Sequence, residues 1–174
     1  MNDQIRHARE IAIAILNPGK ADLDRGLALH TDSVVVESYG LGLMAPMDGA
    51  RVARKIEEGA TELELQDLTE DLRMTRWVDE PSLKQEFEEI WEASGVTCSY
   101  QNAGEEGNDP LRLIKRLARH TYVTDMAPEL MRRVVHPDDI VAAKAEGKHC
   151  RYMTGNGIPL AGGQVNTQEE LRFI

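Results

Sequence analysis

Three short segments of strand character alternate with longer helical segments along this chain, and this alternation restricts the fold more than any other feature. The strand segments cover residues 33–37, 95–103 and 149–155, and the first reads "SVVVE". β-Branched residues favour strands, and a strand that reaches the next one through a helical crossover pairs with it in parallel. We therefore expect an α/β fold in which helices cover a parallel sheet.

Helices are predicted wherever apolar residues recur at intervals of three and four. Asp48 and Thr61 are expected N-caps, Gly95 is a stop signal, and Thr167 with Glu170 has the spacing of a capping box. The expected helices cover residues 5–16, 23–30, 48–56, 61–72, 81–93, 109–117, 127–135, 136–147 and 167–174.

The length of 174 residues is sufficient for one ordinary domain with its own core. Three strands are few for an independent parallel sheet, and the final segment "QEELRFI" has neither a glycine nor a basic residue that closes its helix. We expect the amino-terminal part of a single larger α/β domain, a barrel or a doubly wound fold, with more strands after residue 174. Residues 1–26 would form a helical extension of it.

The composition excludes several classes of partner. The formal net charge of −10 argues against nucleic acid and against an anionic membrane surface. The chain has no basic, apolar export signal at its start and no run of eighteen apolar residues. Cys98 and Cys150 each lie in a strand segment, where a buried free thiol is expected. These features favour the cytoplasm.

The stretch "LALHTDSVVVES", residues 27–38, contains a metal-like His-x-Asp pair, His30 and Asp32. In parallel α/β folds, ligands gather at the carboxyl ends of the strands, whereas this pair precedes the first strand. We therefore expect structural roles: His30 beside the carbonyl groups of its helix's last turn, and Asp32 at a turn or at the start of the strand.

The carboxyl ends of the three strand segments are the places where we expect a site. They supply polar side chains that are short of usual metal ligands, and Glu105 and Glu106 are expected in a solvated acidic loop. For Asn156, between two glycines, a tight turn and a functional role are equally good readings. The candidates are Glu37, Ser38, Tyr39, Gln101, Asn102, Glu105, Glu106, Thr154 and Asn156.

Other catalytic signals are weak in this sequence. The "GNG" at residues 155–157 fails the G-x-G-x-x-G spacing, because Leu160 occupies the third glycine position. No G-x-S-x-G sequence occurs. The remaining histidines are scattered singly and are expected to be surface or packing residues: His7, His120, His136 and His149.

The segment "DDIVAAKAEGKHCRYMTGNGIPLAGG", residues 138–163, resembles the membrane (renal) dipeptidase family of metallopeptidases. In that family an Asp-Ile helix ends in Ala-Glu-Gly-Lys and leads into a strand that finishes in a Gly-x-Glu-Gly-Gly turn. The segments "SVVVES" and "QNAG" are similar to the ends of the family's first two strands, and "ELRFI" is similar to the start of its next helix.

This resemblance implies a (β/α)8 TIM-type barrel, of which the chain would supply the first three or so βα units with extra helices. It also implies hydrolysis of dipeptides by water that two zinc ions activate. In the family, a His-x-Asp pair after the first strand and a glutamate after the third strand hold the metal. The matching positions here are Tyr39, Leu41 and Asn156, and none of these three is a usual zinc ligand.

Two readings of different class follow. In the first, the full-length protein is a divergent dipeptidase-like hydrolase, with zinc held by ligands from later strands and with a pocket formed by Glu37, Tyr39, Gln101, Asn102 and Asn156. In the second, the barrel has lost its metal site and binds a small molecule without catalysis. An acidic interaction surface is a third reading, and a homodimer is an option that the sequence leaves open. Residues 1–174 alone are expected to be inactive, because a partial barrel leaves an incomplete site.

Overall fold

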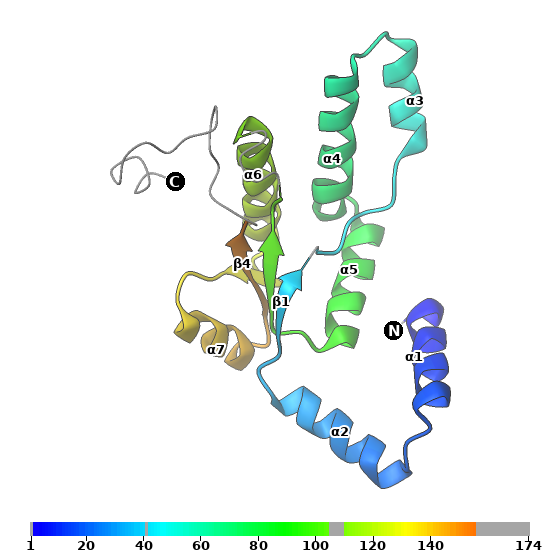
Figure 1. Cartoon of the computed structure of the whole chain (residues 1–174), viewed down its shortest axis with the longest axis vertical. Coiled ribbons are helices and arrows are strands. Elements are labelled where there is room, and N and C mark those ends of the chain that lie inside the picture. Colours follow the sequence, from blue (N-terminus) through cyan, green and yellow to red (C-terminus); the bar gives the residue numbers. More distant parts are fainter. Residues whose placement is uncertain (1, 41, 105–109, 156–174) are drawn as a thin grey trace.

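The computed structural model describes residues 2–40, 42–104 and 110–155 as an α/β fold built on a four-stranded parallel sheet (Figure 1). The strands lie in the order β1-β2-β4-β3. They are β1 (Val36–Gly40), β2 (Cys98–Asn102), β3 (Met131–Arg133) and β4 (His149–Thr154). The helices are α1 (Asp3–Leu16), α2 (Lys20–Asp32), α3 (Gly49–Glu57), α4 (Glu62–Asp79), α5 (Pro81–Ser94), α6 (Pro110–Met126) and α7 (Pro137–Ala145).

The expected α/β class and parallel sheet are confirmed, but the expectation of three strands was wrong. Residues 127–135, predicted as a helix, instead contain the short strand β3, which pairs with β4. The apolar spacing around Met131 also suits a helix. However, α6 ends at Met126, and Pro128, two residues later, disfavours its continuation. Pairing with β4 then provides hydrogen-bond partners for the backbone N–H and C=O groups of β3.

The first strand begins later than the sequence pattern indicates. It was expected at residues 33–37 and is found at Val36–Gly40, because α2 continues to Asp32 and Ser33 is its C-cap. The second strand, expected at residues 95–103, is shorter and covers Cys98–Asn102. These shifts move Glu37 from the end of the first strand to its interior.

Local end signals position several helices as predicted. The Asp48 side chain accepts a hydrogen bond from the Arg51 backbone N–H and starts α3. Thr61 forms a capping box with Glu64 at the start of α4. Gly95 ends α5 in the left-handed conformation with φ 67°, which glycine adopts without steric cost. The predicted capping box of Thr167 and Glu170 lies outside the described residues.

The sheet carries helices on both faces. On one face, buried Cys98 and Cys150 pack against Ala143 and Ile140 of α7. The other face carries the main core, to which α4, α5 and α6 contribute. In Figure 1, α7 and the pair α4–α5 lie on opposite sides of the strands. Both cysteines are free and buried, as predicted.

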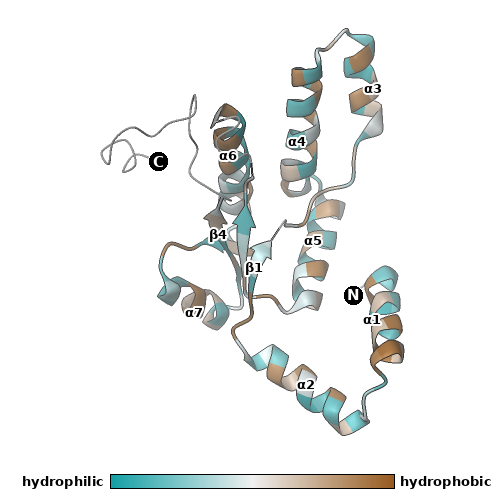
Figure 2. Ribbon diagram, viewed as in Figure 1, coloured by the Kyte–Doolittle hydropathy of each residue, from teal (hydrophilic) through white to brown (hydrophobic). Residues whose placement is uncertain are grey.

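Helices α1 and α2 extend away from the sheet (Figure 1), and neither has a buried residue. Apolar side chains on α1 face solvent, including Ile15 and Leu16 near its end (Figure 2). Among the described residues, none of the helices combines the length and the apolar character that crossing a membrane requires.

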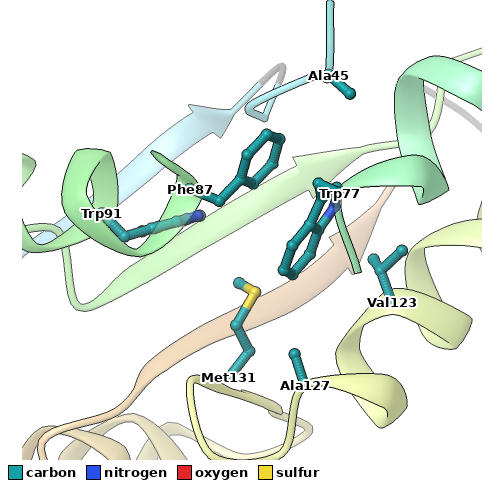
Figure 3. Packing of buried hydrophobic residues seen from close by; sticks show 7 residues of the cluster. All are labelled: Ala45, Trp77, Phe87, Trp91, Val123, Ala127 and Met131. Atoms are coloured by element: carbon teal, nitrogen blue, oxygen red, sulfur yellow. The ribbon is translucent and has the colours of Figure 1, made fainter. Parts of the chain in front are cut away.

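The main core is centred on aromatic side chains from neighbouring helices. Trp77 of α4 stacks on Phe87 of α5 with ring centroids 4.7 Å apart and an interplanar angle of 7°. Trp91, Val123 and Met131 complete the packing around them (Figure 3). The indole of Trp77 is completely buried. This cluster fixes α4 and α5 against α6 and the sheet.

Charged side chains join α4 to α6 beside this core. Glu70 of α4 accepts hydrogen bonds from Arg112, Arg116 and Arg119 of α6, at 2.7, 2.7 and 3.1 Å. Lys115 forms an ion pair with Asp67. Burial alone would raise the pKa of the Glu70 carboxyl, but hydrogen bonds from Arg116 and Arg112 bring that pKa below its ordinary value. The carboxylate is thus stabilised in its charged form.

Replacing the central indole should be strongly destabilising. We expect Trp77→Ala to lower the free energy of unfolding by about 3–5 kcal/mol, because it leaves a cavity in a closely packed core. Urea unfolding followed by circular dichroism and by the fluorescence of Trp91 measures this. Leu63→Ala, on the exposed side of α4, is the control and should change stability by less than ~0.5 kcal/mol. A loss below ~1 kcal/mol in Trp77→Ala would contradict this description of the core.

Removing the charge of Glu70 should also destabilise the protein. Glu70→Gln is expected to cost about 1–3 kcal/mol at pH 7, because three guanidinium groups lose their shared carboxylate. Since the folded-state pKa is lowered, the wild-type advantage is present above the ordinary glutamate pKa of about 4.3 and is lost as the pH falls through the folded-state value.

Unfolding free energies of both proteins between pH 3 and pH 7 measure this dependence. Glu10→Gln, at an exposed position of α1, is the matched control and should follow the wild type at every pH. A constant difference between Glu70→Gln and the wild type across this range would show that the carboxylate charge is not what stabilises the pair of helices.

Candidate functional site

A cavity of about 960 Å³ lies at the carboxyl ends of β1 and β2, between α4 and α6. This is the edge of a parallel sheet at which ligands usually bind, because strand ends and the following loops converge there. Tyr39 and Gly42 line it from the end of β1, and Asn102, Ala103 and Gly104 line it from the end of β2. We refer to it as the α4–α6 cavity.

Its walls are two helical stripes that face each other. Residues three or four positions apart lie on the same side of a helix, so the cavity-lining residues of each helix form one stripe along it. The stripe on α4 comprises Glu62, Leu65, Gln66, Thr69, Glu70 and Arg73. The stripe on α6 comprises Arg112, Arg116 and His120. Both walls are therefore rich in charged and polar groups.

The two arginines of the α6 wall are held in place by hydrogen bonds. Glu70 binds Arg112 and Arg116, and Nη1 of Arg116 also donates to the Ala103 carbonyl at 3.0 Å. These contacts link the wall to the floor at the end of β2. Arg73 on the α4 wall is exposed and has no ion-pair partner among the residues that the structure describes.

His120 lies at the inner end of the α6 stripe and is only 6% exposed. Burial, together with the positive charges of Arg151, Arg116 and Arg119, lowers the pKa of its imidazole to about 3. The ring is therefore neutral at pH 7. Within the described ranges, neither ring nitrogen has a hydrogen-bond partner.

Behind His120 the sheet presents polar side chains where apolar ones are usual. Arg151 of β4 is completely buried, and its Nε has no hydrogen-bond partner in the described structure. Burial lowers the pKa of Arg151 to about 10, so the guanidinium stays charged at pH 7. Ser99, which pairs with Arg151 in register, is also buried. A buried positive charge with no acidic partner in this part of the chain raises the electrostatic potential nearby.

Gln101 of β2 is also buried and supports the end of β1. Its Nε2 donates to the Gly40 carbonyl at 3.4 Å, whereas its Oε1 has no partner in the described structure. A Cβ on Gly42 would lie 2.2 Å from this oxygen, and Gly42 has φ 67°. Position 42 therefore requires glycine, because a Cβ would collide with Gln101 and because the backbone has a positive φ.

The structure brings together some of the sequence-predicted pocket residues and separates others. Tyr39, which is 66% exposed, and Asn102 both line the α4–α6 cavity. Gln101 lies in β2 beneath the end of β1 and does not line it. Glu37 was expected in the same pocket but lines a separate cavity of about 370 Å³ beside Trp91. Its place inside β1 is the reason.

Other candidates lie outside the described residues: Leu41, Glu105, Glu106 and Asn156. Ser38 belongs to β1 and Thr154 ends β4, and neither lines the α4–α6 cavity. The structure therefore describes only some of the residues that the sequence predicts for the site.

The residues at the dipeptidase family's metal positions do not fit zinc. The phenol of Tyr39 is an uncommon ligand, the leucine at position 41 has no donor atom, and the amide of Asn156 is neutral. Among the described residues, no group of three or more His, Cys, Asp or Glu side chains is arranged to hold a metal ion.

His30 and Asp32 lie at the end of α2, before the amino end of β1, and neither lines the α4–α6 cavity. His30 Nε2 lies 2.8 Å from the carbonyl of Ser94, the last residue of α5. A carbonyl at a helix end was expected, but the helix is α5 rather than the histidine's own. The contact joins the end of α2 to the end of α5.

Sequence reasoning missed the two residues that most distinguish this cavity, Arg73 and His120. His120 was expected to be a packing or surface residue. The spacing of Arg112, Arg116 and His120 at four-residue intervals was the available signal, because it aligns them on one face of α6. The same spacing also suits an ordinary solvated helix face, so only the tertiary contacts identify it.

A comparison with protein-family models gives no match for this chain, and a comparison with curated proteins gives no significant match.

Proposed function

We propose that this chain is part of a dipeptidase-like hydrolase and that the α4–α6 cavity holds its dipeptide substrate. One observation carries the proposal: a cavity of about 960 Å³ with arginines on both walls lies at the carboxyl ends of two parallel strands. Cavities that bind small molecules commonly have volumes of roughly 300–1,000 Å³. A dipeptide with a free carboxylate matches both the size and the positive walls.

The strand arrangement supports a TIM-type barrel as the framework. The strands β1, β2 and β4 are parallel neighbours in that order, as three successive barrel strands would be. The segment that resembles the dipeptidase family includes α7 and β4. Strand β3, of three residues, pairs with the outer edge of β4. In a closed barrel, another strand would have to pair with β4 in place of β3.

The chemistry proposed for the described residues is binding and orientation. Arginines attract the substrate carboxylate, and the neutral imidazole of His120 can donate one hydrogen bond and accept another. Tyr39 supplies a phenol at the opening of the cavity. Because the residues at the family's metal positions do not fit zinc, we assign no hydrolytic step to a metal. Zinc held by ligands from later strands stays a prediction for the full-length protein.

The alternative proposal is a barrel that binds a small carboxylate without hydrolysing it. It is favoured by Tyr39, which stands where the family has a metal-binding histidine and is exposed in this cavity. In both proposals the two buried free thiols favour a reducing compartment such as the cytoplasm. A homodimer is compatible with both.

Blocking the cavity tests the function directly. In the full-length protein, Thr69→Trp places an indole inside the α4 wall, and we expect the rate of dipeptide hydrolysis to fall at least about tenfold because the substrate is excluded. Hydrolysis is measured as release of free amino acids, with and without added Zn²⁺. Leu63→Trp makes the same substitution on the exposed side of α4 and should leave the rate unchanged.

The outcomes separate the two proposals. Hydrolysis by the wild type that Thr69→Trp abolishes supports the hydrolase. Dipeptide binding without any hydrolysis, weakened by Thr69→Trp, supports the binding protein and refutes the hydrolase. Equal hydrolysis by Thr69→Trp and Leu63→Trp would refute a role for the α4–α6 cavity in either function.

A further inference from the structure

The α4–α6 cavity has an inner end where positive charge exceeds what the described carboxylates balance. Arg73 lines it from α4 and has no ion-pair partner among the described residues. Arg151 lies behind it, completely buried, also without an acidic partner in the described structure. By contrast, Glu70 is shared by Arg112, Arg116 and Arg119. This local excess stands out in a chain whose formal net charge is −10.

His120 experiences the positive electrostatic potential at this inner end of the cavity. Its side chain is more than nine-tenths buried, lines the cavity and has no hydrogen-bond partner on its ring within the described ranges. The surrounding arginines oppose a positive charge on the imidazole. The same field favours a negative charge beside the ring, and an unpartnered N–H buried in a cavity gains free energy from an acceptor.

We propose that the inner end of the α4–α6 cavity is a carboxylate subsite in which Arg73 of α4 and His120 of α6 bind the two oxygens of a ligand carboxylate. Arg73 supplies a charged donor, and neutral His120 supplies an N–H donor from the opposite wall. The inference deepens the proposed function, on which it rests for the identity of the ligand, by naming the two residues that bind the carboxyl terminus of the peptide. A molecule whose carboxyl group is an amide should be bound poorly.

The two donors of the subsite come from different helices, Arg73 from α4 and His120 from α6. Arg73 lies near the last of the cavity-lining residues of α4, which include Met74, and His120 is the last cavity-lining residue of α6. The ion pairs between Glu70 and the α6 arginines hold these two stripes together. The carboxylate would therefore meet a buried His120 donor that packing holds in place, and the exposed Arg73 side chain would pair with it from the α4 wall.

Calorimetric titration at pH 7 with glycylglycine and with glycylglycine amide tests the proposal on the full-length protein. We expect the wild type to bind glycylglycine at least about tenfold more tightly than the amide, since hydrogen bonds to a charged group are the strong ones. Arg73→Gln should weaken glycylglycine binding about 10- to 100-fold and leave amide binding unchanged. Arg51→Gln, on the exposed surface of α3, is the matched control and should bind both as the wild type does.

A second measurement does not depend on how a His120 variant folds. In the wild type, the ring NMR signals of His120 should shift on addition of glycylglycine and not on addition of the amide. The signals are assigned on the wild type itself by through-bond NMR correlation with the backbone. Among the five histidines of the chain, those of His7 on exposed α1 serve as the internal control.

Several outcomes would overturn the subsite. They are equal affinity for the peptide and its amide, unchanged glycylglycine binding by Arg73→Gln, an unshifted His120 ring, and inorganic phosphate binding as tightly as the peptide. Selective carboxylate binding without hydrolysis would leave the subsite standing and refute the hydrolase. Hydrolysis of the amide as fast as the free peptide would refute the subsite and leave the hydrolase standing.

Discussion

The pairing of β2 with β4 is the constraint on which the rest of the structure depends. It is the longest register in the sheet, running from Cys98 beside Cys150 to Asn102 beside Thr154. Because side chains alternate across a strand, this register assigns Cys98 and Cys150 to the face that α7 covers, and Ser99 and Arg151 to the other face. A shift of β4 by one residue would move Cys150 to the other face and place Arg151 against α7.

The electrostatics of the cavity follow from this arrangement. Arg151 is buried because its strand position faces α6, and its charge acts on His120, which α6 presents to the same space. Glu70 compensates the α6 arginines across the gap between the helices. The cavity of a chain with a formal net charge of −10 thereby contains two arginines, Arg73 and Arg151 behind it, that no described carboxylate pairs with.

The two functional readings differ in what they require of this region. A binding protein needs the positive cavity, whereas a hydrolase also needs a group that activates water. In both proposals, Arg73 and His120 bind a carboxylate and Tyr39 lies at the opening of the cavity. The proposed hydrolase also rests on the resemblance in residues 138–163, which include α7 and β4.

The sequence by itself determined the α/β class, the parallel sheet and most helix limits, because periodicity, the capping residues Asp48 and Thr61 and the stop at Gly95 act within a few residues of chain. Only the tertiary structure decided that residues 131–133 form a strand, that Glu37 does not line the α4–α6 cavity, and that His120 is buried beside Arg151. These results depend on which distant segments pair, and local patterns carry no information on the partner that a strand edge or a helix face will meet.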